Sequence, residues 1–345
     1  MVNRKTKSKV LRKREALRGY KQYLRSLRRS SKQHVPFIPM DKSRDDKQYV
    51  SRKNKQKVRS KTIKCPSIFS IEHNLQRVLD TLSNVRNLNV KKYGKIMIDL
   101  SEVVEFDITA LVMLLSNLNH LSQKEVSVSG NYPMNFAARE FFERSGFLKH
   151  MKTINRRLLG SYSDHGLIVN IGKDNYNSND IALINKKAIE HLGVSRQHYQ
   201  RLNSIVGEMG GNTIKYAYHI NKHYLYGFYK YEAYTAFVFA DSGYGILKTL
   251  RKTFGRTILD MIQNVGDIKV LEGAFNKKYG SRTGEANRNR GLPFIKLNSD
   301  EGIVSDLQCI SNNVMLDFTN VSASQTLSSN YSGTVYSWNI YNNTK

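Results

Sequence analysis

The sequence predicts a mixed α/β protein that follows a basic N-terminal arm. Apolar runs typical of buried strands alternate with segments in which apolar residues recur every three or four positions, as they do on helices. The positive charge of the 345-residue chain is concentrated in its first fifth, so the remainder has the composition of a globular protein. Strands that alternate with helices argue for sheets covered by helices, and the length is sufficient for two domains.

Residues 1–65 form the predicted basic arm. They hold 23 Lys or Arg and 4 Asp or Glu, a net charge of +19 out of +27 for the whole chain. Between residues 8 and 30, apolar side chains recur at helical spacing among arginines and lysines, which predicts a basic amphipathic helix. Residues 31–65 are polar and predict a flexible linker. Such an arm suits a phosphate-bearing partner, namely nucleic acid, a ribosomal surface or anionic lipid, although its apolar stripe can also dock on the body of the protein.

Cysteine and hydropathy patterns exclude several classes of protein. Cys65 and Cys309 are the only cysteines, too few for a zinc site or a disulfide framework, so we expect two reduced, unpaired thiols. No apolar run reaches the ~18 residues that a membrane span needs. The charged N-terminus lacks the apolar segment of a secretory signal, so we expect a cytoplasmic protein.

Residues 66–152 predict the first α/β domain. In order along the chain, the patterns indicate a helix over 71–88, a buried strand over 95–100, a strongly apolar helix over 109–121, a short strand over 126–130 and a helix over 136–142.

Residues 153–180 predict a connecting segment, and residues 181–345 predict the second domain. The connecting segment is polar and glycine-containing, with one short strand over 167–171. The second domain begins with a helix over 196–218 and strands over 224–231 and 234–240. Residues 246–290 hold two helical patches and a loop rich in Gly, Arg and Asn. A helix then begins at Leu292, and strands over 304–310, 314–318 and 333–340 close the domain.

The segment Glu208-Met-Gly-Gly-Asn212 carries the sharpest chemical signal. Glu208 and Asn212 are four residues apart on the predicted helix and therefore share one face. Mg2+ prefers oxygen ligands, and Asn212 can supply one beside nucleotide phosphates. Glu208 can then act as a general base toward a water or hydroxyl that attacks the γ-phosphate.

The turn Asp241-Ser-Gly243-Tyr-Gly245 follows a predicted strand and supplies a second part of a nucleotide site. Asp241 can accept a hydrogen bond from the exocyclic amine of adenine. Gly243 and Gly245 have no side chains, so the backbone can approach a bound ring closely.

A basic, glycine-containing segment over 284–292 can bind phosphates. It runs into the helix predicted from Leu292, and helix N-termini attract phosphate. The residues that we expect to contribute are Arg288, Arg290, Gly291 and Leu292, with Lys215 as a further cation near Asn212. ATP and Mg2+ are the cofactors that these patterns indicate.

These motifs resemble those of the GHKL ATPase superfamily, in which they occur in the same order. The N box corresponds to residues 208–217, the first glycine box to 241–246, the second to 289–296 and the last to Gly333-Thr334. The resemblance implies a Bergerat-type α/β sandwich with Asn212 on Mg2+, Glu208 as general base and Asp241 on adenine, supported by Thr334. The chain departs from the family at Asn289, where the family usually has glycine.

Residues 66–152 resemble the STAS domain, the fold of anti-sigma-factor antagonists. The resemblance rests on residues 98–115, which include Asp107-Ile-Thr-Ala-Leu111, and on 141–148. It implies that Thr109 occupies the position of the STAS phosphoacceptor, and a helix N-terminus would stabilise a phosphate there. The alternative interpretation is that Thr109 is an ordinary helix N-cap.

Together the resemblances imply an ATP-binding regulator of the anti-sigma-factor serine/threonine kinase type, which phosphorylates a Ser or Thr of a STAS domain in cis or in trans. Its protein partner would be a STAS-domain or sigma-factor-like regulator. Two other hypotheses stay open. The chain can be a nucleic-acid-associated ATPase switch that uses residues 1–65 and a nucleotide-gated homodimer, or a module that binds ATP without hydrolysing it.

Overall fold

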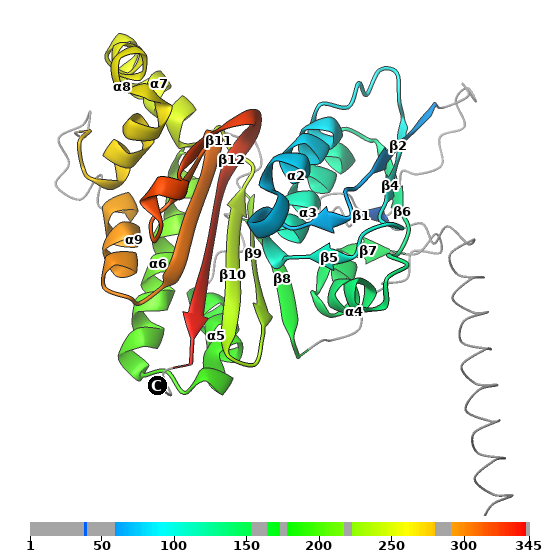
Figure 1. Cartoon of the computed structure of the whole chain (residues 1–345), viewed down its shortest axis with the longest axis horizontal. Helices are drawn as coiled ribbons and strands as arrows, with labels where there is room; N and C mark the ends of the chain where they lie inside the picture. Colours follow the sequence, from blue (N-terminus) through cyan, green and yellow to red (C-terminus); the bar gives the residue numbers. More distant parts are fainter. Residues whose placement is uncertain are drawn as a thin grey trace, which may run out of the picture.

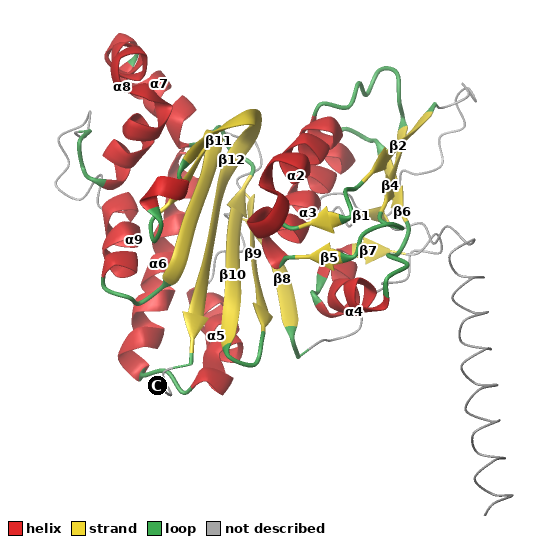
Figure 2. Cartoon of the chain, viewed as in Figure 1, coloured by secondary structure: helices red, strands yellow, loops and turns green. Residues whose placement is uncertain are grey.

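The computed structural model describes residues 59–152, 164–172, 178–216, 223–279 and 291–342, together with the backbone of 38–39. The fold is mixed α/β, as the sequence predicts. A three-stranded sheet, a layer made by two helices, a five-stranded sheet and a second set of helices lie side by side (Figures 1 and 2). The helix predicted over 8–30 lies outside the described residues.

The smaller sheet is parallel, with the strand order β2-β4-β6. Its strands are β2 (Ser60–Lys64), β4 (Lys95–Asp99) and β6 (Ser127–Gly130). Helices α2 (Ile71–Arg86) and α3 (Ile108–Gln123) follow β2 and β4, and α4 (Phe136–Arg144) follows β6. The assignment of residues 60–64 to the linker was therefore wrong, because β2 pairs with β4 along its whole length.

Two pairs of very short strands complete this part of the chain. Strand β3 (Ile68–Phe69) pairs in parallel with β5 (Glu105–Phe106). Strand β1 (Ile38–Pro39) pairs with β7 (Met151–Lys152) in the antiparallel sense.

The larger sheet is antiparallel, with the order β11-β12-β10-β9-β8. Its strands are β8 (Gly166–Gly172), β9 (His223–Lys230), β10 (Tyr234–Asp241), β11 (Ser305–Asp317) and β12 (Gln325–Tyr341). The strand predicted over 167–171 is present, but it is an edge strand of this sheet. The stretch 153–180 is thus more than a connection, since β8 pairs with β9.

Helices on the outer side of the larger sheet are α5 (Ser178–Ile189), α6 (Arg196–Tyr216), α7 (Ile246–Phe254), α8 (Arg256–Phe275) and α9 (Gly291–Asp300). All but α5 fall in regions that the sequence predicts as helical. Helix α5 was missed because its first turn, Ser-Asn-Asp, has the composition of a loop.

The two closing strands predicted over 304–310 and 314–318 are a single strand, β11. The polar residues between the two apolar runs do not end the strand, because Asn312 adopts a left-handed conformation with φ 58° at a bulge against β12.

The larger sheet is apolar on both faces. Alternate residues of each strand point to opposite sides. Leu225, Val238 and Val335 join the core formed with α2, α3 and the small sheet, whereas Tyr226, Phe237 and Trp338 join the core beneath α5–α9. The two predicted domains therefore share the first of these cores, which the small sheet, α2 and α3 form with one face of the larger sheet.

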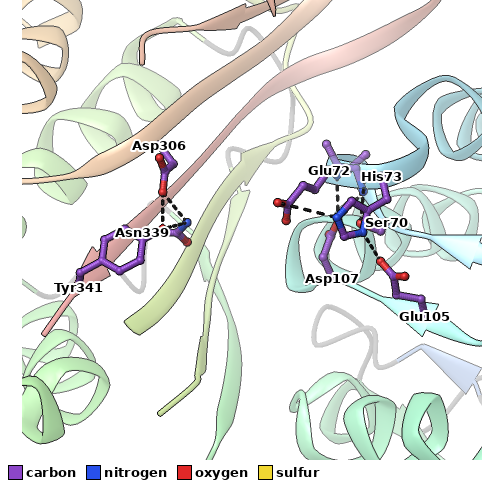
Figure 3. Close-up of polar contacts among 9 residues, drawn as sticks. Ser70, Glu72, His73, Glu105, Asp107, Asp306, Asn339 and Tyr341 are labelled. Carbon is purple, nitrogen blue, oxygen red and sulfur yellow. Dashed lines mark hydrogen bonds and ion pairs between the residues drawn. The ribbon is translucent and has the colours of Figure 1, made fainter. Parts of the chain in front are cut away.

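A single carboxylate caps the two helices that lie between the sheets. Asp107 is the N-cap of α3, where its Oδ1 accepts from the backbone N–H of Ala110 at 2.6 Å. Its Oδ2 accepts from the first N–H groups of α2, at Ile71 and Glu72 (Figure 3). Burial raises the pKa of Asp107, opposed by these N–H donors and the Ser70 hydroxyl. The same view shows Asn339 and Tyr341 donating to Asp306, which joins the ends of β11 and β12.

Candidate functional site

Helix α6 positions Glu208 and Asn212. Its apolar face, with Leu202, Ile205 and Met209, is buried under the larger sheet. This packing fixes the rotation of the helix, so that the Glu208 side chain is exposed and Asn212, one turn later, is half-buried.

The start of α9 lies directly against these two side chains. A Cβ atom on Gly291 would lie 2.7 Å from Glu208 Oε2 and 3.0 Å from Asn212 Nδ2, so only glycine fits without displacing them. Within the described part of the chain, the buried Nδ2 atom of Asn212 has no hydrogen-bond partner. An unsatisfied buried donor costs about 1–3 kcal/mol, and an atom of this kind in a folded protein is explained by a bound water or ion, by a catalytic role or by strain.

Asp241 ends β10 and is held from several directions. Its Oδ1 accepts from the N–H of Gly243 at 2.7 Å and from the N–H of Thr334 at 3.3 Å. The hydroxyls of Thr334 and Thr213 also stabilise the carboxylate. Burial raises the pKa of Asp241 from 3.8 to about 6, because these donors offset only part of the desolvation. The carboxylate is therefore mostly ionised at neutral pH, and it titrates within the mildly acidic range.

Sequence reasoning missed Thr213. This buried residue follows Asn212, and its hydroxyl has two acceptors for its single proton, the Asp241 carboxylate and the Met209 carbonyl at 3.2 Å. Thr213 contacts Asp241, so the residue next to Asn212 on α6 touches the start of the 241–245 turn. A threonine one turn after a buried methionine is a weak signal for such a contact, since threonines on buried helix faces usually bond only the preceding turn.

Gly245 packs closely against a side chain of β11. Its backbone has φ 82°, and a Cβ atom there would lie 2.5 Å from Asn312 Oδ1. The space beside Gly245 is thus filled by Asn312, and the lack of a side chain serves the packing of the turn.

The other predicted residues lie in different settings. Leu292 packs on the core beneath α9, and Lys215 is exposed near the end of α6. Arg288 and Arg290 lie outside the described residues.

Thr109 is buried in the first turn of α3, with 7% of its surface exposed. The interpretation of Thr109 as the N-cap was wrong, because Asp107 fills that position. Helices α3 and α6 cover opposite faces of the larger sheet (Figure 1), so Thr109 and Glu208 are separated by it.

Both cysteines are unpaired, as predicted. Both are also buried, and burial raises the pKa of each thiol. Among the described residues, no cluster of three or more His, Cys, Asp or Glu side chains is arranged to hold a metal ion. None of the helices in the described ranges is long and apolar enough to span a membrane.

Comparison with known proteins finds no family model that matches the sequence and no curated protein with significant similarity to it.

Proposed function

We propose that the chain binds Mg-ATP where α6, the 241–245 turn and the start of α9 meet, and that it acts as a regulatory protein of the anti-sigma-factor kinase type. The observation that carries the proposal is the convergence of motifs distant in sequence. Thr334 and Thr213 stabilise Asp241, and Gly291 lies against Glu208 and Asn212. Residues from four separate motifs thus form two sets of contacts, which adjoin through the neighbouring residues Asn212 and Thr213.

Each side chain there has a role that its geometry supports. Asp241, ionised at neutral pH and oriented by its donors, accepts from an exocyclic amine. The buried Nδ2 of Asn212 has no hydrogen-bond partner among the described residues, which suits the amide to meet a polar ligand. Its oxygen would hold Mg2+ beside the phosphates, and the ion would neutralise their charge. The exposed Glu208 has no ion-pair partner among the described residues, so its carboxylate is available to accept the proton of an attacking hydroxyl.

We place the acceptor hydroxyl on another protein. Thr109 is buried, and the larger sheet lies between its helix and α6. Transfer from this site to Thr109 of the same chain would require the two cores to separate. A STAS-domain or sigma-factor-like partner in trans fits this arrangement better.

The charge of residues 1–65 favours one second candidate, an ATPase switch that binds nucleic acid. Nucleic-acid affinity that falls steeply with salt, together with hydrolysis stimulated by nucleic acid, would support this candidate. Label transferred from ATP to a protein would support the kinase. Nucleotide binding without hydrolysis or transfer would support the simple binding module.

The test is calorimetric titration with a non-hydrolysable ATP analogue and Mg2+. We expect Asn212→Ala to weaken binding at least about tenfold, since about 1.4 kcal/mol is lost with one ligand contact. Ser204→Ala is the matched control, because Ser204 is exposed on the same helix and bonds only within it. Absence of binding by the unmodified protein would refute the proposal, as would equal affinities of the Asn212 variant and the control.

A further inference from the structure

A bulge in β11 lies beside the 241–245 turn. Ser311 pairs with Thr334, but Asn312 pairs with Tyr331, so the register shifts at this point. Asn312 has φ 58°, and only 7% of its surface is exposed. Asparagine tolerates this left-handed region better than most residues, yet glycine would adopt it more readily. The asparagine side chain therefore needs its own explanation.

The Asn312 side chain forms hydrogen bonds with the backbone before and after Gly245. Asn312 Nδ2 donates to the Tyr244 carbonyl at 2.8 Å, and its Oδ1 accepts from the N–H of Lys248 at 3.2 Å. The amide lies where a side chain of Gly245 would otherwise be. One buried amide thus connects the end of the turn with the first turn of α7.

Helix α7 has no side-chain cap of its own, since its N-cap residue is Gly245. The bulge supplies the missing acceptors. Ser311 Oγ accepts from the N–H of Ile246 at 2.7 Å, and Asn312 Oδ1 accepts from Lys248 two residues later. The first N–H groups of a helix need such partners when they are not in water.

The same bulge reaches Asp241. Ser311 Oγ lies 3.4 Å from Thr334 Oγ1, and Thr334 in turn stabilises the Asp241 carboxylate. The residues that hold the carboxylate and those that hold the turn after it therefore occupy neighbouring positions of β11 and β12.

We propose that Asn312 is a positioning residue for the proposed nucleotide site. Its amide fixes the 241–245 turn and the start of α7 relative to Asp241, so that the turn is held in its binding conformation before nucleotide arrives. The inference rests on the proposed function. It adds a residue outside the recognised motifs, which acts through the turn and need not contact the ligand.

The test compares Asn312→Gly with Asn313→Ala. Glycine keeps the left-handed backbone and removes only the amide. Asn313 is the matched control, because it is the adjacent residue and its side chain bonds Asp267 of α8, which is outside both the turn and the first residues of α7. Two measurements are made on the full chain: affinity for a non-hydrolysable ATP analogue with Mg2+, and hydrogen exchange of the Ile246 and Lys248 amides without nucleotide.

For Asn312→Gly we expect affinity to fall about tenfold, because its hydrogen bonds to Tyr244 in the turn and to Lys248 at the start of α7 are lost. We expect the Lys248 amide, which loses its acceptor, and the neighbouring Ile246 amide to exchange faster. Asn313→Ala should leave both readouts near those of the unmodified protein. Unchanged exchange in Asn312→Gly would overturn the inference, as would unchanged affinity in a protein that binds nucleotide. If the unmodified chain binds no nucleotide, the proposed function fails, and the exchange rates alone then decide whether Asn312 positions the turn.

Discussion

The two faces of the larger sheet differ in side-chain chemistry. The face toward α2 and α3 is largely aliphatic, with Leu225, Val238 and Val335 in the core that contains the buried apolar residues of α3. The face toward α5–α9 is aromatic, and the rings of Phe237 and Trp338 stack with centroids 5.4 Å apart. At one end of the aromatic side, buried polar groups gather around Asp241. The aliphatic face therefore serves packing alone, whereas the aromatic face serves packing and also borders the proposed site.

The largest expected effect comes from uncovering the aliphatic face. A fragment over 164–345 keeps the larger sheet and its helices but loses α2 and α3, so the apolar residues of that face become exposed. A patch of this kind is incompatible with a stable monomer. We expect the fragment to aggregate or to lack a cooperative thermal transition by circular dichroism. A fragment over 59–345 is the control, since it retains both cores and should melt cooperatively. Cooperative melting of the shorter fragment would show that the two parts have independent cores.

Single substitutions on the two faces should have smaller effects, which differ in how far they lower the free energy of unfolding. Phe237→Ala removes a fully buried ring from the aromatic core and should lower the free energy of unfolding by about 3–5 kcal/mol. Val238→Ala removes two buried methyl groups from the other face and should cost about 1–3 kcal/mol. Urea unfolding followed by circular dichroism measures both. A larger loss for Val238→Ala would contradict this ranking.

The smallest effect is a pH dependence of the free energy of unfolding, which Asp241 should cause. Because the pKa of Asp241 is raised to about 6, the folded protein keeps this proton between about pH 4 and 6 while the unfolded chain has lost it. The contribution of protonated Asp241 to the stability of the fold is therefore fully present below about pH 4 and is lost as the pH rises through about 6. It amounts to up to about 3 kcal/mol. Asp241→Asn should lack this dependence in urea titrations over the same range.

Nucleotide affinity should change in the opposite direction. Acceptance from an exocyclic amine is strongest with the ionised carboxylate, so affinity should increase as the pH rises from 5 to 7. Asp241→Asn is again the reference, since titration of the nucleotide itself affects both proteins equally. Parallel pH profiles for the two proteins would show that Asp241 does not face the ligand.

The sequence was sufficient to place most elements, because they have strong apolar periodicity. Helices α2, α3 and α6 were predicted nearly to their ends. Strand β2 was missed since only one of its five residues, Ile63, is buried, so its lysine-rich pattern resembles a linker.

Some contacts of the candidate site could likewise be predicted from the sequence, and others could not. The proximity of Glu208 and Asn212 follows from helix geometry alone. The contacts of Asn312 with the 241–245 turn join residues 64 and 68 positions apart and depend on the register of a bulged strand. No local pattern encodes such a register, so neither Asn312 nor Ser311 could be identified from the sequence.

The shared cap at Asp107 has a consequence for the order of events during synthesis. Helix α2 leaves the ribosome well before the carboxylate that binds its first N–H groups, since Ile71 and Asp107 are 36 residues apart. Until residue 107 emerges, α2 has only Ser70 to cap its start. We therefore expect the start of α2 to be fully capped only once residue 107 is available, that is, when α3 can form as well.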